Sequence, residues 1–301
     1  MSIAVENQTV IGELQAAQPF DLRTSIRFLG GFGACRGDQI LTEDSITKAI
    51  SVDRSAIVFR LTPTEEGVAY QLYSDVALEN GTVAAVRTAV DRYLSLSDDL
   101  QAFYRLAEQD EPAYARHIRQ AYGLHQVRFL TIPEIAVWAL VSQRTPSAHA
   151  LGMKRRIAAL GPTTEVGGVR FQAFPELDLL ASLNYDDWYA LVRNERKAGY
   201  LGHLMCGLKE IGEDFLRTVP YADASKALHG IKGVGDFTAS AILLRGFGRM
   251  DSLPLEMPQF RDVAARVYGR PVDPVWVRHH YGAYVGYWGY YLKSAGIAAY
   301  A

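Results

Sequence analysis

The sequence predicts an α+β protein in which a small antiparallel β-sheet with packed helices precedes a mostly helical region. Residues 55–61 (SAIVFRL) and 67–76 (GVAYQLYSDV) are rich in β-branched and aromatic residues, and a loop with Pro and Gly separates them. From residue 98 onward, apolar residues recur at helical spacing between loops that contain Gly, Pro or Asp. We therefore expect an α+β domain over residues 1–97 and a helical region of two subdomains over 98–301.

Helical spacing predicts one helix in the N-terminal region, at 82–96, where Val83, Val86 and Val90 share a face. Residues 160–175 (LGPTTEVGGVRFQAFP) follow neither the helical nor the strand pattern, and we expect a long irregular insertion there. In the C-terminal region the spacing predicts helices over 99–109, 111–122, 132–143, 146–160, 175–183, 185–193, 197–213, 222–229, 236–247, 258–268 and 274–294.

The composition is that of a folded protein with more than one core. Of its 301 residues, 49% are hydrophobic and 21% are charged, and no low-complexity run occurs. No apolar run is long enough to span a membrane, and residues 1–12 lack the basic start and apolar core of a signal peptide. Cys35 and Cys206 lie far apart without a CxxC pair, which favours free thiols in a reducing cytoplasm.

Charge is divided unevenly along the chain, although the formal net charge is only −2. Residues 1–120 carry 11 Lys and Arg against 17 Asp and Glu, whereas residues 121–301 carry 20 against 16. A polyanion would therefore meet the second part of the chain.

The strongest motif is LHGIKGVGDFTASAILL at 228–244, which predicts two helices joined by a tight glycine turn. Gly233 and Gly235 allow positive φ and leave no Cβ in the way, so that backbone N–H groups can face a phosphate at a helix N-terminus. Lys232 adds positive charge, and Asp236 suits the N-cap of the second helix. An ordinary glycine turn between core helices is the alternative, but the flanking Lys and helices favour phosphate binding.

Four segments, in this order, resemble the helix-hairpin-helix DNA glycosylases. Residues 134–161 (EIAVWALVSQRTPSAHALGMKRRIAALG) are similar to the helix–Gln–loop–helix segment that enters DNA near the lesion. Residues 174–208 resemble the stretch that follows it, residues 228–254 the hairpin, and residues 281–295 (YGAYVGYWGYYLKSA) the aromatic terminal helix. Upstream, residues 18–33 (QPFDLRTSIRFLGGFG) resemble the N-terminal domain of the bacterial inducible 3-methyladenine glycosylase branch.

This resemblance implies a base-excision repair enzyme that binds double-stranded DNA and hydrolyses the N-glycosidic bond of a flipped alkylated purine of the 3-methyladenine type. Phe237 occupies the position where lyase-type relatives carry a Schiff-base lysine, so we expect a monofunctional enzyme. The resemblance implies no redox cofactor and no catalytic metal, although a monovalent cation (Na or K) at the hairpin is compatible with it. We expect a nucleoid-associated monomer in the cytoplasm, without membrane contact.

The predicted site residues fall into two groups. Contacts to DNA are expected from the hairpin and from the loop that follows the first helix of residues 134–161. An ordinary surface loop is the alternative reading of that loop. The expected contact residues are Lys232, Gly233, Val234, Gly235, Thr238, Gln143, Arg144 and Thr145. A flipped, electron-poor base stacks well on aromatic faces. The expected pocket residues, each of which core packing would also explain, are Phe28, Trp138, Tyr200, Phe237, Met257, Tyr284 and Trp288.

A catalytic carboxylate is the open question at 251–258 (DSLPLEMP). In the family an Asp begins the helix after the Pro, and an ungapped alignment places Met257 at that position. Glu256 lies one residue earlier and is our candidate catalytic residue, because a carboxylate stabilises the positive charge that develops on the sugar. Two alternatives remain: a site that relies on stacking and on the lability of a cationic base, and a relative that binds damaged DNA without cleaving it.

Overall fold

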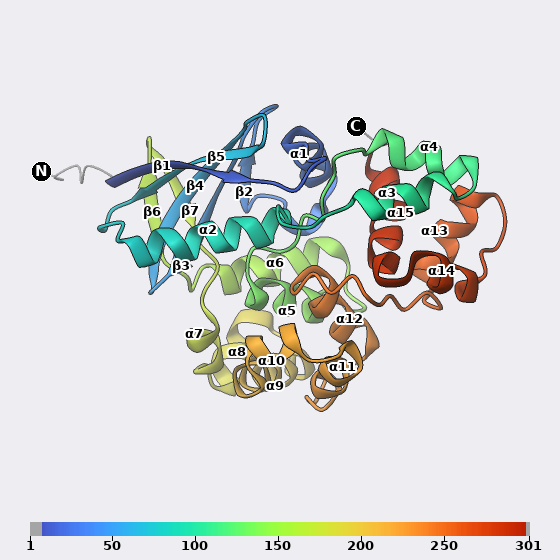
Figure 1. The fold of residues 1–301 in the computed structure, drawn as a ribbon. Helices are drawn as coiled ribbons and strands as arrows, with labels where there is room; N and C mark the ends of the chain where they lie inside the picture. Colours follow the sequence, from blue (N-terminus) through green and yellow to red (C-terminus); the bar gives the residue numbers. More distant parts are fainter. Residues whose placement is uncertain (1–7, 299–301) are drawn as a thin grey trace, which may run out of the picture.

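The computed structural model describes residues 8–298 and contains an antiparallel sheet in the order β1-β5-β4-β3-β2. Its strands are β1 Gln8–Gln15, β2 Gln39–Leu41, β3 Ile46–Val52, β4 Ser55–Pro63 and β5 Gly67–Ser74. The loop between β4 and β5 coincides with the predicted loop. Helices α1 (Leu22–Gly31) and α2 (Asn80–Leu94) contact this sheet (Figure 1).

The remaining elements are mostly helical, as the sequence predicts, so the α+β fold class is confirmed. Short 3₁₀ turns occur at Gly33–Cys35 and Gly282–Tyr284. The helices are α3 Gln101–Glu108, α4 Pro112–Gln120, α5 Ile132–Val141, α6 Ser147–Ala158, α7 Leu177–Ala181, α8 Tyr185–Val192, α9 Glu195–Ile211, α10 Glu213–Thr218, α11 Tyr221–His229, α12 Asp236–Arg245, α13 Pro258–Tyr268, α14 Pro274–Tyr281 and α15 Val285–Ala298.

Residues 160–175 are not irregular, and that prediction is wrong. The segment forms a hairpin of β6 (Thr163–Val166) and β7 (Val169–Gln172), which contacts β3 and β4. Gly167 and Gly168 both have positive φ, 58° and 77°, as a tight two-residue turn requires. The Gly-Gly pair between two short runs was the available signal.

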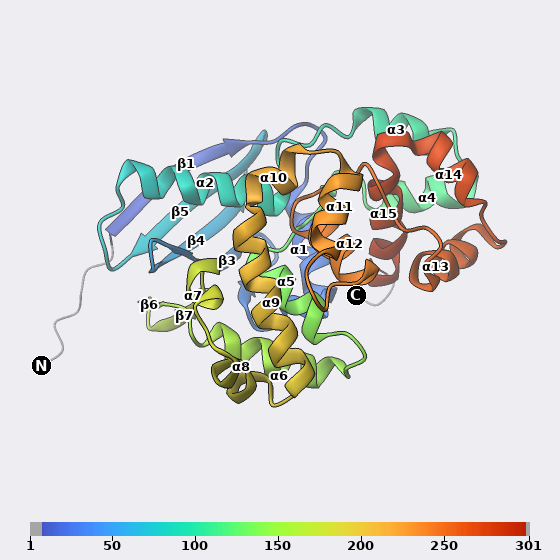
Figure 2. The ribbon, with the colours of Figure 1, turned by 90° about the horizontal axis from the view of Figure 1, so that it is seen from below.

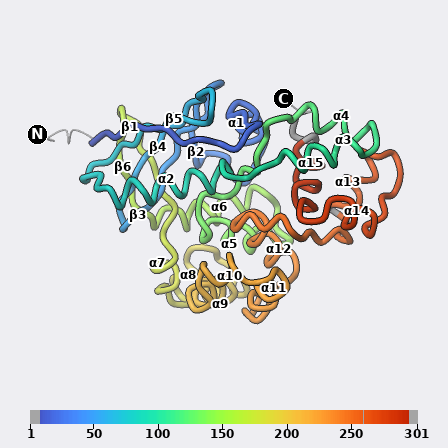
Figure 3. Tube along the Cα trace, viewed as in Figure 1, coloured from blue at the N-terminus to red at the C-terminus, as the bar shows by residue number. Residues whose placement is uncertain are grey.

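Two large clusters of buried side chains form the core, and one of them combines segments from both ends of the chain. The first joins the sheet, α1 and α2 with α3, α4 and α13–α15, so it draws on both ends of the chain. The second lies among α5–α12. In Figures 1 and 3 the α5–α12 helices lie below the sheet and the α3–α4–α13–α15 group, and Figure 2 shows the molecule from below, with these helices toward the viewer.

Helix α5 connects these parts, and its sequence explains why. IPEIAVWALV is apolar on nearly all faces, and all but one of its residues are buried. A helix of this kind is stable only when it is surrounded by other elements. It contacts α12, α9 and α6, which places the hairpin helix α12 against the centre of the molecule.

Among the described residues, no helix has the length and apolar character needed to cross a membrane.

Candidate nucleic-acid and base-binding site

The predicted hairpin forms between α11 and α12. Gly233 adopts φ +96°, and a Cβ at this position would lie 2.6 Å from Cδ1 of Tyr200. Gly233 is therefore required both by its backbone conformation and by the ring against which it packs. The Val234 N–H donates to the Ile231 carbonyl at 3.1 Å and closes the turn.

The start of α12 differs in one detail from the prediction. Gly235 is the N-cap residue, and Asp236 is the first helical residue, with its carboxylate 2.9 Å from Nε2 of His229. Lys232 and Gly235 are exposed, whereas Val234 and Thr238 are buried. The exposed turn and its lysine can therefore reach a phosphate, while Thr238 acts inside the fold.

The loop at residues 143–145, which was predicted to contact DNA, is held against the hairpin helix α12. Gln143 donates from its side-chain amide to the Thr238 hydroxyl, which joins the two sets of predicted DNA contacts. Lys197 of α9 donates to the carbonyls of Leu140, Val141 and Gln143 at 3.1, 3.0 and 3.0 Å, and so closes the C-terminus of α5. These contacts fix where the loop leaves the helix.

At its tip the loop presents two further predicted residues. Arg144 is exposed at φ +49°, and Thr145 is half-buried, with its hydroxyl 2.9 Å from the Gln143 carbonyl. Because a non-glycine residue in this region costs conformational energy, the neighbouring contacts must hold Arg144 in place. Arg144 is thus positioned outward at a fixed point beside the hairpin.

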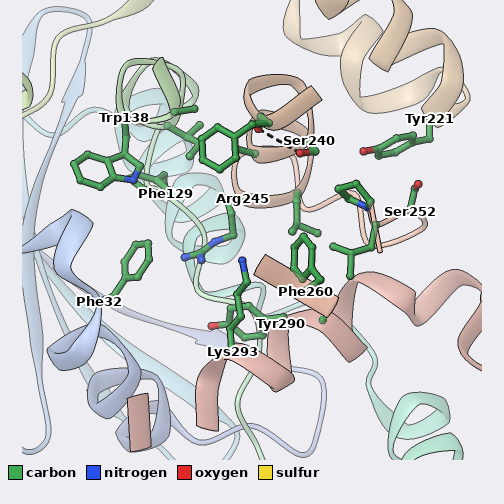
Figure 4. Close-up of a pocket in the computed structure, with 18 of the residues that line it drawn as sticks. Phe32, Phe129, Trp138, Tyr221, Ser240, Arg245, Ser252, Phe260, Tyr290 and Lys293 are labelled. Atoms are coloured by element: carbon green, nitrogen blue, oxygen red, sulfur yellow. Dashed lines mark hydrogen bonds between the residues drawn. The ribbon is translucent and has the colours of Figure 1, made fainter. Parts of the chain in front are cut away.

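A cavity of about 250 Å³ lies where the N-terminal region, the α5–α12 helices and the C-terminal helices α13 and α15 meet. Its walls come from α1, α5, α11, α12, the loop 252–254, α13 and α15. Most of the wall is apolar, and Figure 4 shows its labelled side chains converging on one space. The volume and the aromatic lining suit one planar heterocycle.

Three of the predicted pocket residues line this cavity: Phe28, Trp138 and Phe237. The prediction missed five other aromatic residues of the wall, which are Phe32, Phe129, Tyr221, Phe260 and Tyr290. Phe237, the second residue of α12, is 38% exposed. Its exposure leaves a ring face available at the hairpin end of the cavity.

The other four predicted pocket residues are not among those that line the cavity. Trp288 is 2% exposed and donates its indole N–H to the Tyr268 hydroxyl at 2.9 Å. Tyr284 and Met257 pack against the first core cluster, and Tyr200 packs beneath the hairpin. On α15 the cavity is faced instead by Gly289, Tyr290 and Lys293.

Two positive side chains line the cavity, and neither was predicted from the sequence. The guanidinium of Arg245 lies between four rings, 4.5 Å from the centroid of Phe32, 5.6 Å from those of Phe28 and Tyr290, and 5.8 Å from that of Phe129. Nζ of Lys293 lies 4.1 Å from the Phe260 centroid. Burial, and then the charge of Arg245, lower the pKa of Lys293 to about 8.

Glu256 lies beside the cavity wall but is not one of its lining residues. Its side chain is 65% exposed, and one of its carboxylate oxygens is 2.5 Å from Arg278 of α14. The hydrogen bond from Arg278 lowers the pKa of the Glu256 carboxyl, which keeps it ionised at neutral pH. Met257 is the N-cap of α13 and Pro258 its first residue, as expected.

One further cluster has the residue types of a metal site. Ligand atoms of Cys35, Asp38 and Glu134 lie within 4.8 Å of one another. However, Nζ of Lys154 is 2.8 Å from Glu134 and also pairs with Asp38, and Nζ of Lys48 is 3.3 Å from Glu134. These ammonium groups already balance the carboxylates, so the cluster is a buried ion-pair network.

Comparisons with known proteins agree with this geometry. No protein-family model matches the chain. The sequence is 24% identical over 217 residues to the DNA-3-methyladenine glycosylase of Bacillus subtilis, covering 70% of this chain and 71% of that protein. The 3-methyladenine DNA glycosylase structure from Archaeoglobus fulgidus superposes with a TM-score of 0.74 at 19% identity, over 95% of this chain and 98% of the other.

The fold is that of the helix-hairpin-helix DNA glycosylases.

The glycosylase fold does not by itself separate the branches of this group. The apo 8-oxoguanine glycosylase/lyase of Clostridium acetobutylicum superposes with a TM-score of 0.69 at 17% identity, over 96% of this chain and 98% of that one. Structures named for alkylated and for oxidised bases are therefore both similar to this chain. The side chains of the cavity must decide between substrate classes.

Proposed function

We propose that this protein is a monofunctional DNA glycosylase that removes a damaged purine flipped out of duplex DNA. The observation that carries the proposal is the aromatic cavity beside the hairpin: Trp138, Phe237 and Phe28 face one space, and the glycine turn begins the helix that forms its wall. An enzyme that acts on a base must take it out of the stack and hold it in such a pocket. Similar solved structures include one in complex with double-stranded DNA.

Two substrate classes are candidates. Alkylated purines of the 3-methyladenine type are supported by the name of the B. subtilis relative and by the aromatic lining. Deaminated or oxidised purines are the second class, and the observation that favours them is the pair of positive side chains, Arg245 and Lys293, in the cavity.

Hydrolysis without strand cleavage is supported by the second residue of α12. Phe237 stands where lyase-type relatives have an amine, and it cannot form a Schiff base. Glu256 is ionised, lies next to the loop that lines the cavity, and is the candidate group to stabilise the oxocarbenium-like sugar and orient water. Its ion pair with Arg278 sets its position before DNA binds.

The test compares wild type with Glu256→Gln on duplexes that carry one damaged purine. We expect wild type to release the free base, and the variant to bind the duplex equally but to react at least about a hundredfold more slowly. Equal release by both proteins would discard Glu256 as the catalytic group. Retained binding with no release by either would support the rival, a protein that binds damaged DNA without cleaving it.

A further inference from the structure

The charges of the cavity affect which damaged purine it accepts. This inference rests on the proposed glycosylase function. Arg245 and Lys293 line the cavity, and none of its lining residues is an Asp or Glu. Figure 4 shows the guanidinium and the ammonium pointing into the space between the rings. A cavity of this charge repels a cation and attracts electron-rich atoms.

Arg245 is fixed in place but is not fully satisfied. One guanidinium N–H donates to the Val127 carbonyl at 2.9 Å, and the Arg245 carbonyl accepts from the Phe129 N–H at 2.9 Å. Its buried Nε has no hydrogen-bond partner among the described residues. A buried donor without a partner is costly, so a ligand that brings an acceptor to this end of the cavity is favoured.

Lys293 is the charged residue in the stretch GYYLK of α15. Among the described residues it forms no ion pair and no hydrogen bond, and its ammonium contacts the face of Phe260. Around it, Arg245 of α12 is the charged neighbour that acts on its pKa, and Tyr221 and Tyr290 are the other titratable groups of the wall.

Helices α1, α4 and α13, which pack against α15, supply no counterion to Lys293 in the described part of the chain. On α1, Arg27 donates to Thr24, and on α4, His117 contacts the Tyr291 carbonyl. On α13, Asp262 pairs with Arg261. An electron-rich partner can therefore approach the Lys293 ammonium from within the cavity.

Cleavage of the N-glycosidic bond leaves the bonding electrons on the base. A purine that is cationic in DNA, such as 7-methylguanine, departs as a neutral molecule and needs no help with this charge. A purine that is neutral in DNA, such as hypoxanthine or 8-oxoguanine, departs as an anion unless positive groups or a proton stabilise it. Two cations that face the base are thus useful for one class and unfavourable for the other.

We propose that Arg245 and Lys293 stabilise negative charge on the departing base, so that the cavity acts on deaminated or oxidised purines in preference to cationic alkylated purines. In the reaction the C1′–N9 bond breaks and its electron pair stays with the purine, where the Arg245 guanidinium and the Lys293 ammonium stabilise the negative charge. Water supplies hydroxide to C1′, and the proton it loses passes to the purine. The sum is hydrolysis to a free purine and an abasic site.

The test measures single-turnover release of hypoxanthine and of 7-methylguanine from the same duplex, with wild type, Lys293→Met and the charge-conserving Lys293→Arg. We expect Lys293→Met to lower hypoxanthine release at least about tenfold while 7-methylguanine release stays within about threefold of wild type. Lys293→Arg should keep the preference for hypoxanthine. Melting temperature and affinity for abasic duplex serve as controls for folding and DNA binding.

Each outcome decides a different claim. An equal loss for both bases in Lys293→Met, or a wild-type preference for 7-methylguanine, would overturn the inference and leave the glycosylase function intact. Release of neither base by wild type, nor of any other damaged purine, would contradict the proposed function itself.

Discussion

The guanidinium of Arg245 lies 4.5 Å from the ring centroid of Phe32, so a residue of the N-terminal region completes the wall built by the hairpin helix. Phe28 and Phe32 stack on one another, with centroids 5.6 Å apart, and both line the cavity. The N-terminal α+β region therefore contributes to the cavity that we propose binds the base.

The first prediction concerns this contact. Phe32→Ala should open the cavity wall and release one face of Arg245, which lowers base release by about tenfold through loss of positioning. Affinity for abasic duplex should be unchanged, because Phe32 contacts Arg245 at the C-terminal end of α12, whereas the glycine turn lies at its N-terminal end. Phe215→Ala, which truncates an exposed ring of α10, is the matched control. Unchanged release by Phe32→Ala would argue that the base does not enter this cavity.

The second prediction concerns the hairpin turn. Gly233→Ala places a methyl group against Tyr200 and strains a backbone at φ +96°, which should destabilise the protein by about 1–3 kcal/mol. Gly235→Ala is the control, since φ is −111° there and nothing lies within 4 Å of its Cβ position. Urea unfolding of both variants measures the difference. Equal stability of the two would contradict the packing of Gly233 on Tyr200.

The third prediction concerns the buried ion-pair network. Burial raises the pKa of Glu134, but Lys154 and Lys48 outweigh burial and lower the pKa to about 2, below the ordinary value of 4.5. A depressed carboxyl pKa contributes stability that is present above about pH 4.5 and is lost as the pH falls toward about 2. The free energy of unfolding of wild type should therefore decline across this window. Glu134→Gln should be less stable at pH 7, and its free energy of unfolding should lack the decline that Glu134 causes between about pH 4.5 and pH 2.

The fourth prediction concerns Lys293 and pH. Its lowered pKa, about 8, means that the ammonium predominates below pH 8 and the neutral amine above it. The ratio of hypoxanthine release to 7-methylguanine release should thus fall as the pH rises from 7 to 9. Lys293→Arg, which stays charged, should show a flat ratio over the same range. A falling ratio in Lys293→Arg would assign the pH dependence to another group.

The hairpin could be predicted from the sequence because its determinants are local: glycines, a lysine and two helical patterns within residues 228–244. The cavity could not, because its walls come from segments as far apart as Phe28 and Lys293, and no periodicity says which segments meet. On α15 the aromatic residues surround the helix, so spacing does not distinguish Trp288, which packs in the core, from Tyr290, which faces the cavity.

Two local signals were nevertheless present. Lys293 follows an aromatic, apolar stretch of α15, and a single charge in such a helix marks either a snorkelling side chain or a site. Gly167-Gly168 marked the β6–β7 turn. The role of Glu256 stays a prediction, because its contact with Arg278 fixes its position but not its chemistry.

The central claim is that a damaged purine leaves DNA from this cavity, and direct measurement of the free base tests it. Wild-type protein is incubated with duplexes that each carry one hypoxanthine, 8-oxoguanine, 7-methylguanine or 3-methyladenine, and released base is measured by chromatography. The account predicts release of at least one free base, with the abasic strand intact until alkali is added. Retained binding to every duplex without release of any base would contradict it.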